Sequence, residues 1–146
     1  MSSRSLNDLD SRMLGPVRQV QTDCSVAGVP TTIITTLRSM EEQKAAVAHG
    51  VSWTLKGMHL PHPPENKSLA VDLCPTELLI RAAHPGATAY EKNWSPSHPD
   101  WWVIANAGLK AGLRSGMDWH GVGLPAVGDA TRHAFDPGHL EFIETP

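Results

Sequence analysis

The chain has 146 residues, with 12 Lys and Arg against 15 Asp and Glu, so its net charge at pH 7 is −3. This length suits one domain that buries its own core without disulfides. A mildly acidic chain with no cluster of basic residues argues against a nucleic-acid-binding protein. The N-terminal sequence lacks the apolar core of a signal peptide, and the longest fully apolar run spans only Trp101 to Ala105. We therefore expect neither an export signal nor a membrane span.

Four residue types stand out in the composition, namely 12 Pro, 12 Gly, 8 His and 5 Trp. Such a composition is more typical of a loop-rich domain that carries a site than of a helical bundle. The two cysteines, Cys24 and Cys74, are too few for the disulfide framework of a small secreted protein. We expect both thiols to be reduced.

The first third of the chain predicts a helix, a strand and a second helix. A stripe of apolar residues recurs every three or four positions and predicts a helix that Gly15-Pro16 could break. The stripe consists of Leu6, Leu9, Met13, Val17, Val20 and Cys24. Residues 31–37 (TTIITTL) are mostly β-branched and predict a strand. Ser39 and Glu42 form a predicted capping box for a helix that runs to about residue 50, so Arg38 lies where the strand meets this helix.

The middle of the chain predicts a loop and then a strand that presents a carboxylate. Residues 57–68 contain three prolines and cannot form regular structure. Residues 69–74 (LAVDLC) alternate, so a strand here places Leu69, Val71 and Leu73 on one face. Asp72 lies on the opposite face.

The last part of the chain predicts two helices and a short strand. A short helix is expected from Pro75 to about Ala83, then a loop over residues 84–98, then a helix from Pro99 to Ala111 that Gly112 ends. A glycine-rich connection follows, to about His133. Residues 139–143 (HLEFI) alternate again and place His139 and Glu141 on one face. Together these elements predict a single α+β domain with a small, mainly antiparallel sheet flanked by helices.

Three potential metal ligands lie on or beside these segments: His59, Asp72 and His139. A catalytic zinc site generally has three N or O ligands from the protein and one position for water, whose pKa the ion lowers toward neutrality. Asp136 precedes His139 by three residues, close enough to accept a proton from that water without binding the metal. Asp136 is therefore our candidate general base.

Each of these residues also has an ordinary structural explanation. A single histidine near a strand end is more often a surface or hydrogen-bonded residue than a ligand. Asp136-Pro137-Gly138 makes a good turn, Asp72 suits a charge that protects a sheet edge, and Glu141 suits a solvated strand position. Spacing alone leaves these interpretations open beside the metal site.

Five short motifs follow one another along roughly residues 30 to 143. They are Arg38-Ser39-x-x-Glu42-Gln43, Gly50-Val51-Ser52-Trp53-Thr54-Leu55-Lys56-Gly57-Met58-His59, Ser68-Leu69-Ala70-Val71-Asp72, Gly116-Met117-Asp118-Trp119 and Asp136-x-x-His139-x-Glu141. Each motif is weak alone, but five in this order are specific. The chain resembles the zinc peptidases of the D-Ala-D-Ala carboxypeptidase superfamily, and most closely the phage L-alanyl-D-glutamate endopeptidases, a peptidase type of endolysin.

The resemblance implies a role for each matched residue and a Hedgehog-like version of the α+β fold. His59, Asp72 and His139 would bind Zn²⁺, and Asp136 would be the catalytic acid and base. Arg38 would neutralise the oxyanion that develops at the scissile carbonyl. Glu141 would orient a ligand histidine through its other ring nitrogen.

The chain departs from the family pattern at two places. His59 precedes Asp72 by 13 residues, across a proline-rich insertion, whereas relatives commonly have about seven. His62 therefore competes for the ligand role, and we favour His59 because it follows the Ser-Trp-Thr-Leu-Lys stretch. Gly57 stands where many relatives have Ser, so a hydrogen bond to the substrate would be missing.

The tryptophans invite a further interpretation as a platform for the sugar rings of a glycan. The candidates are Trp53, Trp101, Trp102 and Trp119. Core packing is the better explanation, because aromatic side chains bury a large area and Trp101 and Trp102 lie in a helix that must bury one side.

The resemblance implies one zinc peptidase domain over residues 1–146, with no separate wall-binding module, that hydrolyses the L-Ala/D-Glu bond of the peptidoglycan stem peptide. Two alternatives are a D-Ala-D-Ala carboxypeptidase or dipeptidase, and a non-catalytic zinc-containing wall-binding domain. A phage endolysin of this kind would accumulate in the host cytoplasm and reach the wall after another protein permeabilises the membrane. We expect a monomer whose partner is the stem peptide.

Overall fold

A computed structural model describes residues 2–48, 57–118, 123–125 and 136–143. The helical elements are η1 (Leu6–Asp8), α1 (Ser11–Val26), α2 (Met40–Ala48), α3 (Thr76–Ala83), α4 (Ala89–Lys92) and α5 (Asp100–Lys110). The strands are β1 (Thr31–Thr35), β2 (Ala70–Pro75), β3 (Arg114–Ser115) and β4 (His139–Glu141). The strands form one sheet in the order β1-β2-β4-β3, and all neighbours are antiparallel. The predicted α+β class with a small antiparallel sheet is confirmed.

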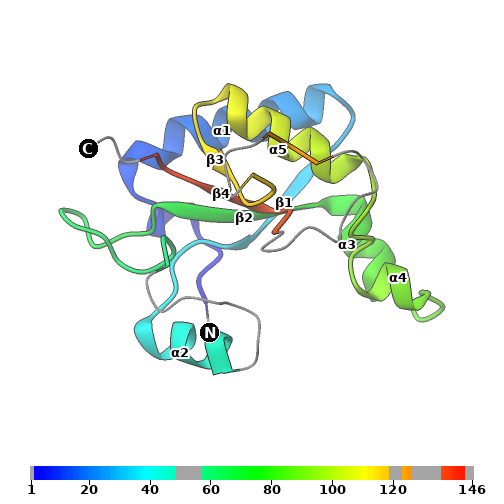
Figure 1. Ribbon diagram of the computed structural model, residues 1–146, viewed down its shortest axis with the longest axis horizontal. Helices are drawn as coiled ribbons and strands as arrows, with labels where there is room; N and C mark the ends of the chain where they lie inside the picture. Colours follow the sequence, from blue (N-terminus) through cyan, green and yellow to red (C-terminus); the bar gives the residue numbers. More distant parts are fainter. Residues whose placement is uncertain (1, 49–56, 119–122, 126–135, 144–146) are drawn as a thin grey trace.

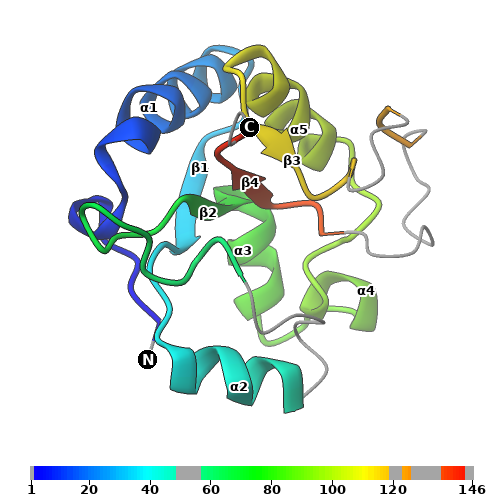
Figure 2. The same cartoon turned by 60° about the vertical axis from the view of Figure 1, so that its left-hand side comes forward.

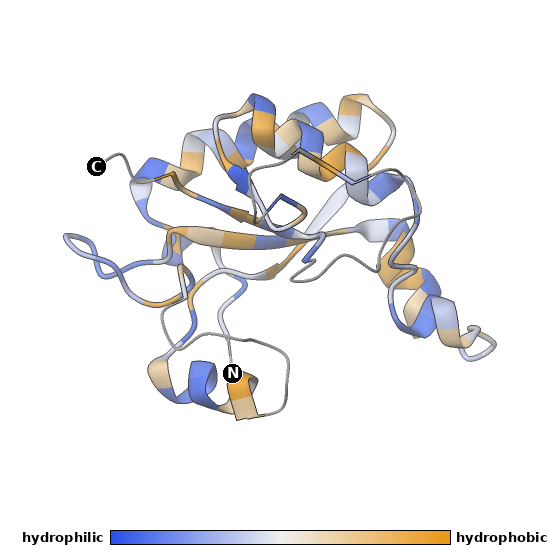
Figure 3. Cartoon of the chain, viewed as in Figure 1, coloured by the Kyte–Doolittle hydropathy of each residue, from blue (hydrophilic) through white to orange (hydrophobic). Residues whose placement is uncertain are grey.

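Helices α1 and α5 lie side by side over one face of the sheet, and α2 lies on the opposite side (Figures 1 and 2). The core fills the space between the two helices and the sheet. Its fully buried members include Met13, Val17 and Val20 of α1, Ile104 of α5 and Leu140 of β4. β2 runs through the middle of the sheet and is mostly hydrophobic (Figure 3). Asp72 is the one residue of β2 that is only partly buried.

The first predicted helix differs in its boundaries and in its continuity. Leu6 lies in the separate turn η1, and α1 begins only at Ser11, after Asp10 accepts a hydrogen bond from the N–H of Arg12. The helix then continues through Gly15-Pro16 without a break. An internal proline costs about 3 kcal/mol, but burial of one apolar side chain contributes about 1.5–3 kcal/mol. The four buried residues of the α1 stripe offset the proline.

The other predicted boundaries agree within about two residues, except that the predicted end of α2 near residue 50 lies outside the described residues. β1 ends at Thr35, because Thr36 and Leu37 instead form backbone hydrogen bonds with Ser3. Two short elements were not predicted. The predicted loop over residues 84–98 contains the short helix α4, which a capping box of Thr88 and Glu91 begins. The predicted glycine-rich connection contains β3, which is too short for any sequence pattern to reveal.

Several local predictions are confirmed. Ser39 and Glu42 exchange the two hydrogen bonds of a capping box at the start of α2. Gly112, just after α5, has a φ of 84°, as expected of a residue that ends a helix. Cys24 and Cys74 are free and buried, and burial raises their pKa to about 11 and about 12.

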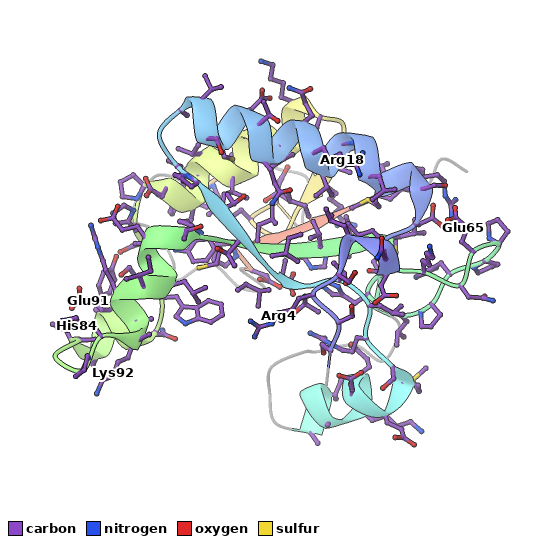
Figure 4. All side chains as sticks on the ribbon, turned by 180° about the vertical axis from the view of Figure 1, so that it is seen from behind. Arg4, Arg18, Glu65, His84, Glu91 and Lys92 are labelled. Atoms are coloured by element: carbon purple, nitrogen blue, oxygen red, sulfur yellow. The ribbon has the colours of Figure 1, made fainter. Side chains whose placement is uncertain are left out.

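The proline-rich loop between α2 and β2 is attached to the start of α1. Glu65 accepts hydrogen bonds from the backbone N–H and the hydroxyl of Ser11 (Figure 4). Arg12 donates one from Nη2 to the carbonyl of Pro63, at 3.2 Å. These contacts fix the loop that carries His59 to the same helix that packs over the sheet. Among the described residues, no helix is long and apolar enough to cross a membrane.

Candidate metal centre

The register of β2 against β4 brings two predicted ligands together. Asp72 is paired directly with His139 across the antiparallel ladder, and side chains at paired positions lie on the same face. His139 Nδ1 lies 3.1 Å from Asp72 Oδ1. Glu141, two residues further along β4, is on this face as well, and its Oε1 accepts a hydrogen bond from His139 Nε2 at 2.9 Å. The two nitrogens of His139 are therefore divided between Asp72 and Glu141.

His59 reaches the same place from outside the sheet. Its carbonyl accepts a hydrogen bond from the N–H of Arg38 at 2.8 Å. Its Nδ1 lies 2.6 Å from the carbonyl oxygen of Thr36, which can only accept, so Nδ1 carries the proton. Its Nε2 lies 3.1 Å from Asp72 Oδ2. The rings of His59 and His139 meet edge to face, with centroids 5.1 Å apart.

These three side chains fit a metal ion. Each offers one ligand atom, and the three atoms lie within 4.8 Å of one another. His59 Nε2 is buried, and in the described part of the chain its one polar neighbour is Asp72 Oδ2 at 3.1 Å. With Nδ1 of His59 donating to Thr36, and Nε2 of His139 donating to Glu141, the opposite nitrogens present their lone pairs to the centre. Two imidazoles and one carboxylate are ligands that Zn²⁺ accepts.

The charges of the metal-free cluster agree with this arrangement. Burial opposes ionisation of Asp72, but the charges and hydrogen bonds of His59 and His139 outweigh it and hold the pKa of this carboxyl well below its usual range. Burial also opposes protonation of His139, but its hydrogen bonds to Asp72 and Glu141 raise its pKa to about 10. Without metal, a proton therefore occupies the position on His139 that a cation would take.

Asp136, the candidate general base, lies at the edge of this cluster. Desolvation and the neighbouring charge of Asp72 raise the pKa of Asp136 to about 6, although the positive charges of His139, His59 and Arg38 act in the opposite direction. Although the residue as a whole is exposed at the surface, its carboxyl group interacts with the charges of Asp72 and the two histidines. A carboxyl group with a pKa near 6 is ionised at pH 7 and is still readily protonated, as a general acid and base must be.

Two glycines hold the Asp136 turn in place. The N–H of Asp136 donates to the carbonyl of Gly116 at 3.0 Å, and the N–H of Gly116 donates to the carbonyl of His139 at 2.8 Å. A Cβ at Gly116 would lie 2.2 Å from the backbone carbonyl oxygen of Asp136 and 3.0 Å from the Cβ of His139. A Cβ at Gly138 would lie 2.4 Å from the oxygen of Leu73. The turn fits against β2 and β3 only because both positions lack side chains.

Arg38 lies just before the start of α2. Its Nη1 donates a hydrogen bond to Oε1 of Gln43 at 2.9 Å. Its charge lowers the pKa of Asp136, so the guanidinium and this carboxyl group act on the same region. The sequence placed Arg38 at this junction, but it pointed to Gln43 and Gly116 only as members of motifs. The carbonyl of Thr36 has no sequence signal at all, because every residue type supplies one.

The remaining candidates lie elsewhere. His62 belongs to an isolated bridge with Lys67 and acts electrostatically on Asp10, and it is not part of the three-ligand group. Trp101 and Trp102 are buried in the core, as expected. The predictions for Trp53 and Trp119 lie outside the described residues. Trp94 is partly exposed, and its backbone carbonyl accepts a hydrogen bond from the Trp101 indole.

Comparisons with known proteins identify a shared fold. No protein-family model matches the sequence, and no curated protein is similar to it in sequence. Among solved structures, the chain is similar to the L-Ala D-Glu endopeptidase ChiX of Serratia marcescens, with a TM-score of 0.53 and 20% sequence identity. The match covers 98% of this chain and 89% of the ChiX chain. The likeness therefore extends over the whole α+β fold in which the candidate metal centre lies.

Proposed function

We propose that this protein is a metal-dependent peptidase that hydrolyses the bond between L-Ala and D-Glu in the peptidoglycan stem peptide. The observation that carries the proposal is the convergence of His59, Asp72 and His139, whose ligand atoms lie within 4.8 Å of one another, with the ionisable Asp136 beside them. The fold shared with an L-Ala D-Glu endopeptidase supports the choice of substrate.

The chain supplies the groups that this reaction needs. Nε2 of His59, a carboxylate oxygen of Asp72 and Nδ1 of His139 would hold a zinc ion. When bound, such an ion polarises the substrate carbonyl and lowers the pKa of water. Asp136 accepts the proton of the attacking water and returns it to the leaving amine. Arg38 pairs with the negative charge that develops on the carbonyl oxygen. Glu141 holds the His139 ring so that Nδ1 faces the centre.

We extend the proposal to a biological role in lysis of a bacterial host by a phage. The motifs that resemble phage endopeptidases support this role. In it, a zinc peptidase domain formed by residues 1–146 acts as a monomer. It accumulates in the host cytoplasm and reaches the wall after another protein permeabilises the membrane.

Digestion of purified peptidoglycan tests the enzymatic proposal. We expect mass analysis to find new N-terminal D-Glu, lost with a chelator and restored by added zinc. Release of D-Ala instead would identify a carboxypeptidase or dipeptidase. Binding to walls without any cleavage would identify a non-catalytic zinc-containing domain, and either result would refute our assignment.

Two sets of variants assign the roles within the site. Asp136→Ala should retain zinc and lose turnover, and a normal rate in this variant would remove Asp136 from the mechanism. His59→Ala should lower the zinc stoichiometry measured by elemental analysis. His62→Ala is the matched control, and a loss of zinc in this variant instead would show that the ligands are wrongly assigned.

A further inference from the structure

We infer that Gln43 is a positioning residue for catalysis, which holds the Arg38 guanidinium toward the substrate carbonyl while leaving its positive charge intact. The inference rests on the proposed function, because it assigns Gln43 a task only if Arg38 stabilises an oxyanion. It does not require any change in the metal ligands.

The first support is the hydrogen bond between the two side chains. Arg38 Nη1 donates to Gln43 Oε1 at 2.9 Å, and Gln43 is 1% exposed although it is polar. Its backbone N–H donates to the carbonyl of Ser39 in the first turn of α2, so the helix fixes where its side chain begins. A buried acceptor fixed in this way can restrict a guanidinium that is itself only partly buried.

The second support is the chemical type of the acceptor. A carboxylate at this position would hold the guanidinium as well or better, since charged hydrogen bonds are stronger. It would also cancel much of the charge that Arg38 must offer to an oxyanion. A carboxamide accepts the hydrogen bond and is neutral. Gln43 therefore orients Arg38 without neutralising it.

The third support is the contact between Gln43 and the segment that carries His59. A Cβ at Gly57 would lie 3.3–3.4 Å from the carboxamide atoms of Gln43. Gly57 precedes His59 by two residues, and the carbonyl of His59 accepts a hydrogen bond from the N–H of Arg38. Gln43 thus bonds to the arginine and lies next to the chain beside the proposed metal ligand. A side chain at position 57 would push against the carboxamide that orients Arg38.

The main experiment compares kcat and KM of Gln43→Leu and Gln43→Glu with the wild type on peptidoglycan fragments. Loss of a hydrogen bond to a charged group should lower kcat of Gln43→Leu roughly 10- to 100-fold. KM should change little, because the oxyanion exists only in the transition state. Gln43→Glu should lower kcat as well, through the lost net charge. Gly57→Ser should lower kcat rather than raise it.

Two controls separate positioning from a general weakening of α2. Ser39→Ala removes the capping box of the same helix and does not touch the Arg38 guanidinium, so it should lower the melting temperature and leave kcat near its wild-type value. In an Arg38→Ala background, Gln43→Leu should have no further effect on kcat. Equal losses of kcat in Ser39→Ala and Gln43→Leu, or additive losses with Arg38→Ala, would overturn the inference.

A readout that needs no turnover keeps this inference separate from the proposed function. In NMR spectra of protein with ¹⁵N-labelled arginine, the held Nη groups of Arg38 should give distinct signals in the wild type and in Gln43→Glu. They should merge in Gln43→Leu, where the guanidinium rotates freely. An active wild type whose Arg38 signals and kcat are unchanged in Gln43→Leu would refute the positioning role. An inactive wild type with the expected spectra would refute only the proposed function.

Discussion

The candidate site joins two regions that are held in place by different forces. Asp72, His139 and Glu141 belong to the ladder between β2 and β4, and their neighbours in these strands are buried in the core. His59 and Arg38 lie outside the ladder. Hydrogen bonds hold them to each other and to neighbouring segments, from His59 Nδ1 to the carbonyl of Thr36, from the Arg38 N–H to the carbonyl of His59, and from Arg38 Nη1 to Gln43.

This difference indicates where the site is tolerant and where it is not. Several constraints fix the position of each side chain in the ladder, because the strand register, the packing of the core and the twist of the sheet must all be compatible. Positions outside it depend on a few polar contacts, each with a net contribution of about 1 kcal/mol. Substitutions on the sheet side should therefore act through metal binding and stability together. Substitutions outside the ladder should change metal binding or the catalytic rate, while the protein remains folded.

Asp72→Ala should have the largest effect. It removes one of the three candidate ligands, a carboxylate that lies 3.1 Å from a nitrogen of each histidine. We therefore expect zinc affinity to fall by more than the 10- to 100-fold typical of an outer partner. Isothermal titration measures it. Asp23→Asn, on the helix that covers the other face, should bind zinc like the wild type. Wild-type affinity in Asp72→Ala would contradict the assigned centre.

Glu141→Gln should have the next largest effect. The amide keeps the shape of the side chain but weakens the hydrogen bond from His139 Nε2 that orients the ring. We expect a 10- to 100-fold loss of zinc affinity with little change in the fold. Glu77→Gln, at an exposed position of α3, is the matched control. If the two variants bind zinc equally well, Glu141 does not orient the ligand.

Gly116→Ala tests how closely the Asp136 turn packs against the sheet. The added Cβ would lie 2.2 Å from the backbone carbonyl oxygen of Asp136. We therefore expect the free energy of unfolding to fall by about 1–3 kcal/mol, as it does for an overpacked core. Gly15→Ala is the control, because nothing lies within 4 Å of its Cβ position. In a helix it should stabilise by about 0.5–1 kcal/mol. Denaturant titration measures the free energy of unfolding, which should fall in Gly116→Ala and rise in Gly15→Ala. Equal changes in the two variants would show that Gly116 is not closely packed.

The pH dependence of zinc binding should be the smallest effect and the most diagnostic. The pKa of His139 is about 10 without metal, so at pH 7 zinc must displace one proton. Affinity should rise by up to about tenfold per pH unit. Titrations in two buffers of different ionisation enthalpy should report release of about one proton.

The raised pKa of His139 also stabilises the metal-free fold below pH 6.5, and this contribution to the free energy of unfolding should disappear as the pH approaches 10. A pH-independent affinity would contradict the pairing of His139 with two carboxylates.

Local patterns predicted most of the elements and missed the smallest. The apolar stripe of α1, the capping box of α2 and the alternation in residues 69–74 each act over a few neighbouring residues, which is the range that a sequence pattern can report. The capping box of Thr88 and Glu91 was present in the sequence as well, but α4 has only one turn and no apolar stripe to accompany it. β3 is a strand only because β4 pairs with it.

The sequence by itself determined the kinds of side chain that can bind a metal, the strands that present two of them and the face on which each lies. Tertiary structure alone decided that Asp72 meets His139 across 67 residues of chain, and that His59 rather than His62 completes the group. It also decided that Gln43 receives Arg38. Strand alternation and helix capping are set by backbone geometry over a few residues. Contacts between distant segments depend on how the whole core packs, and no local pattern encodes that packing.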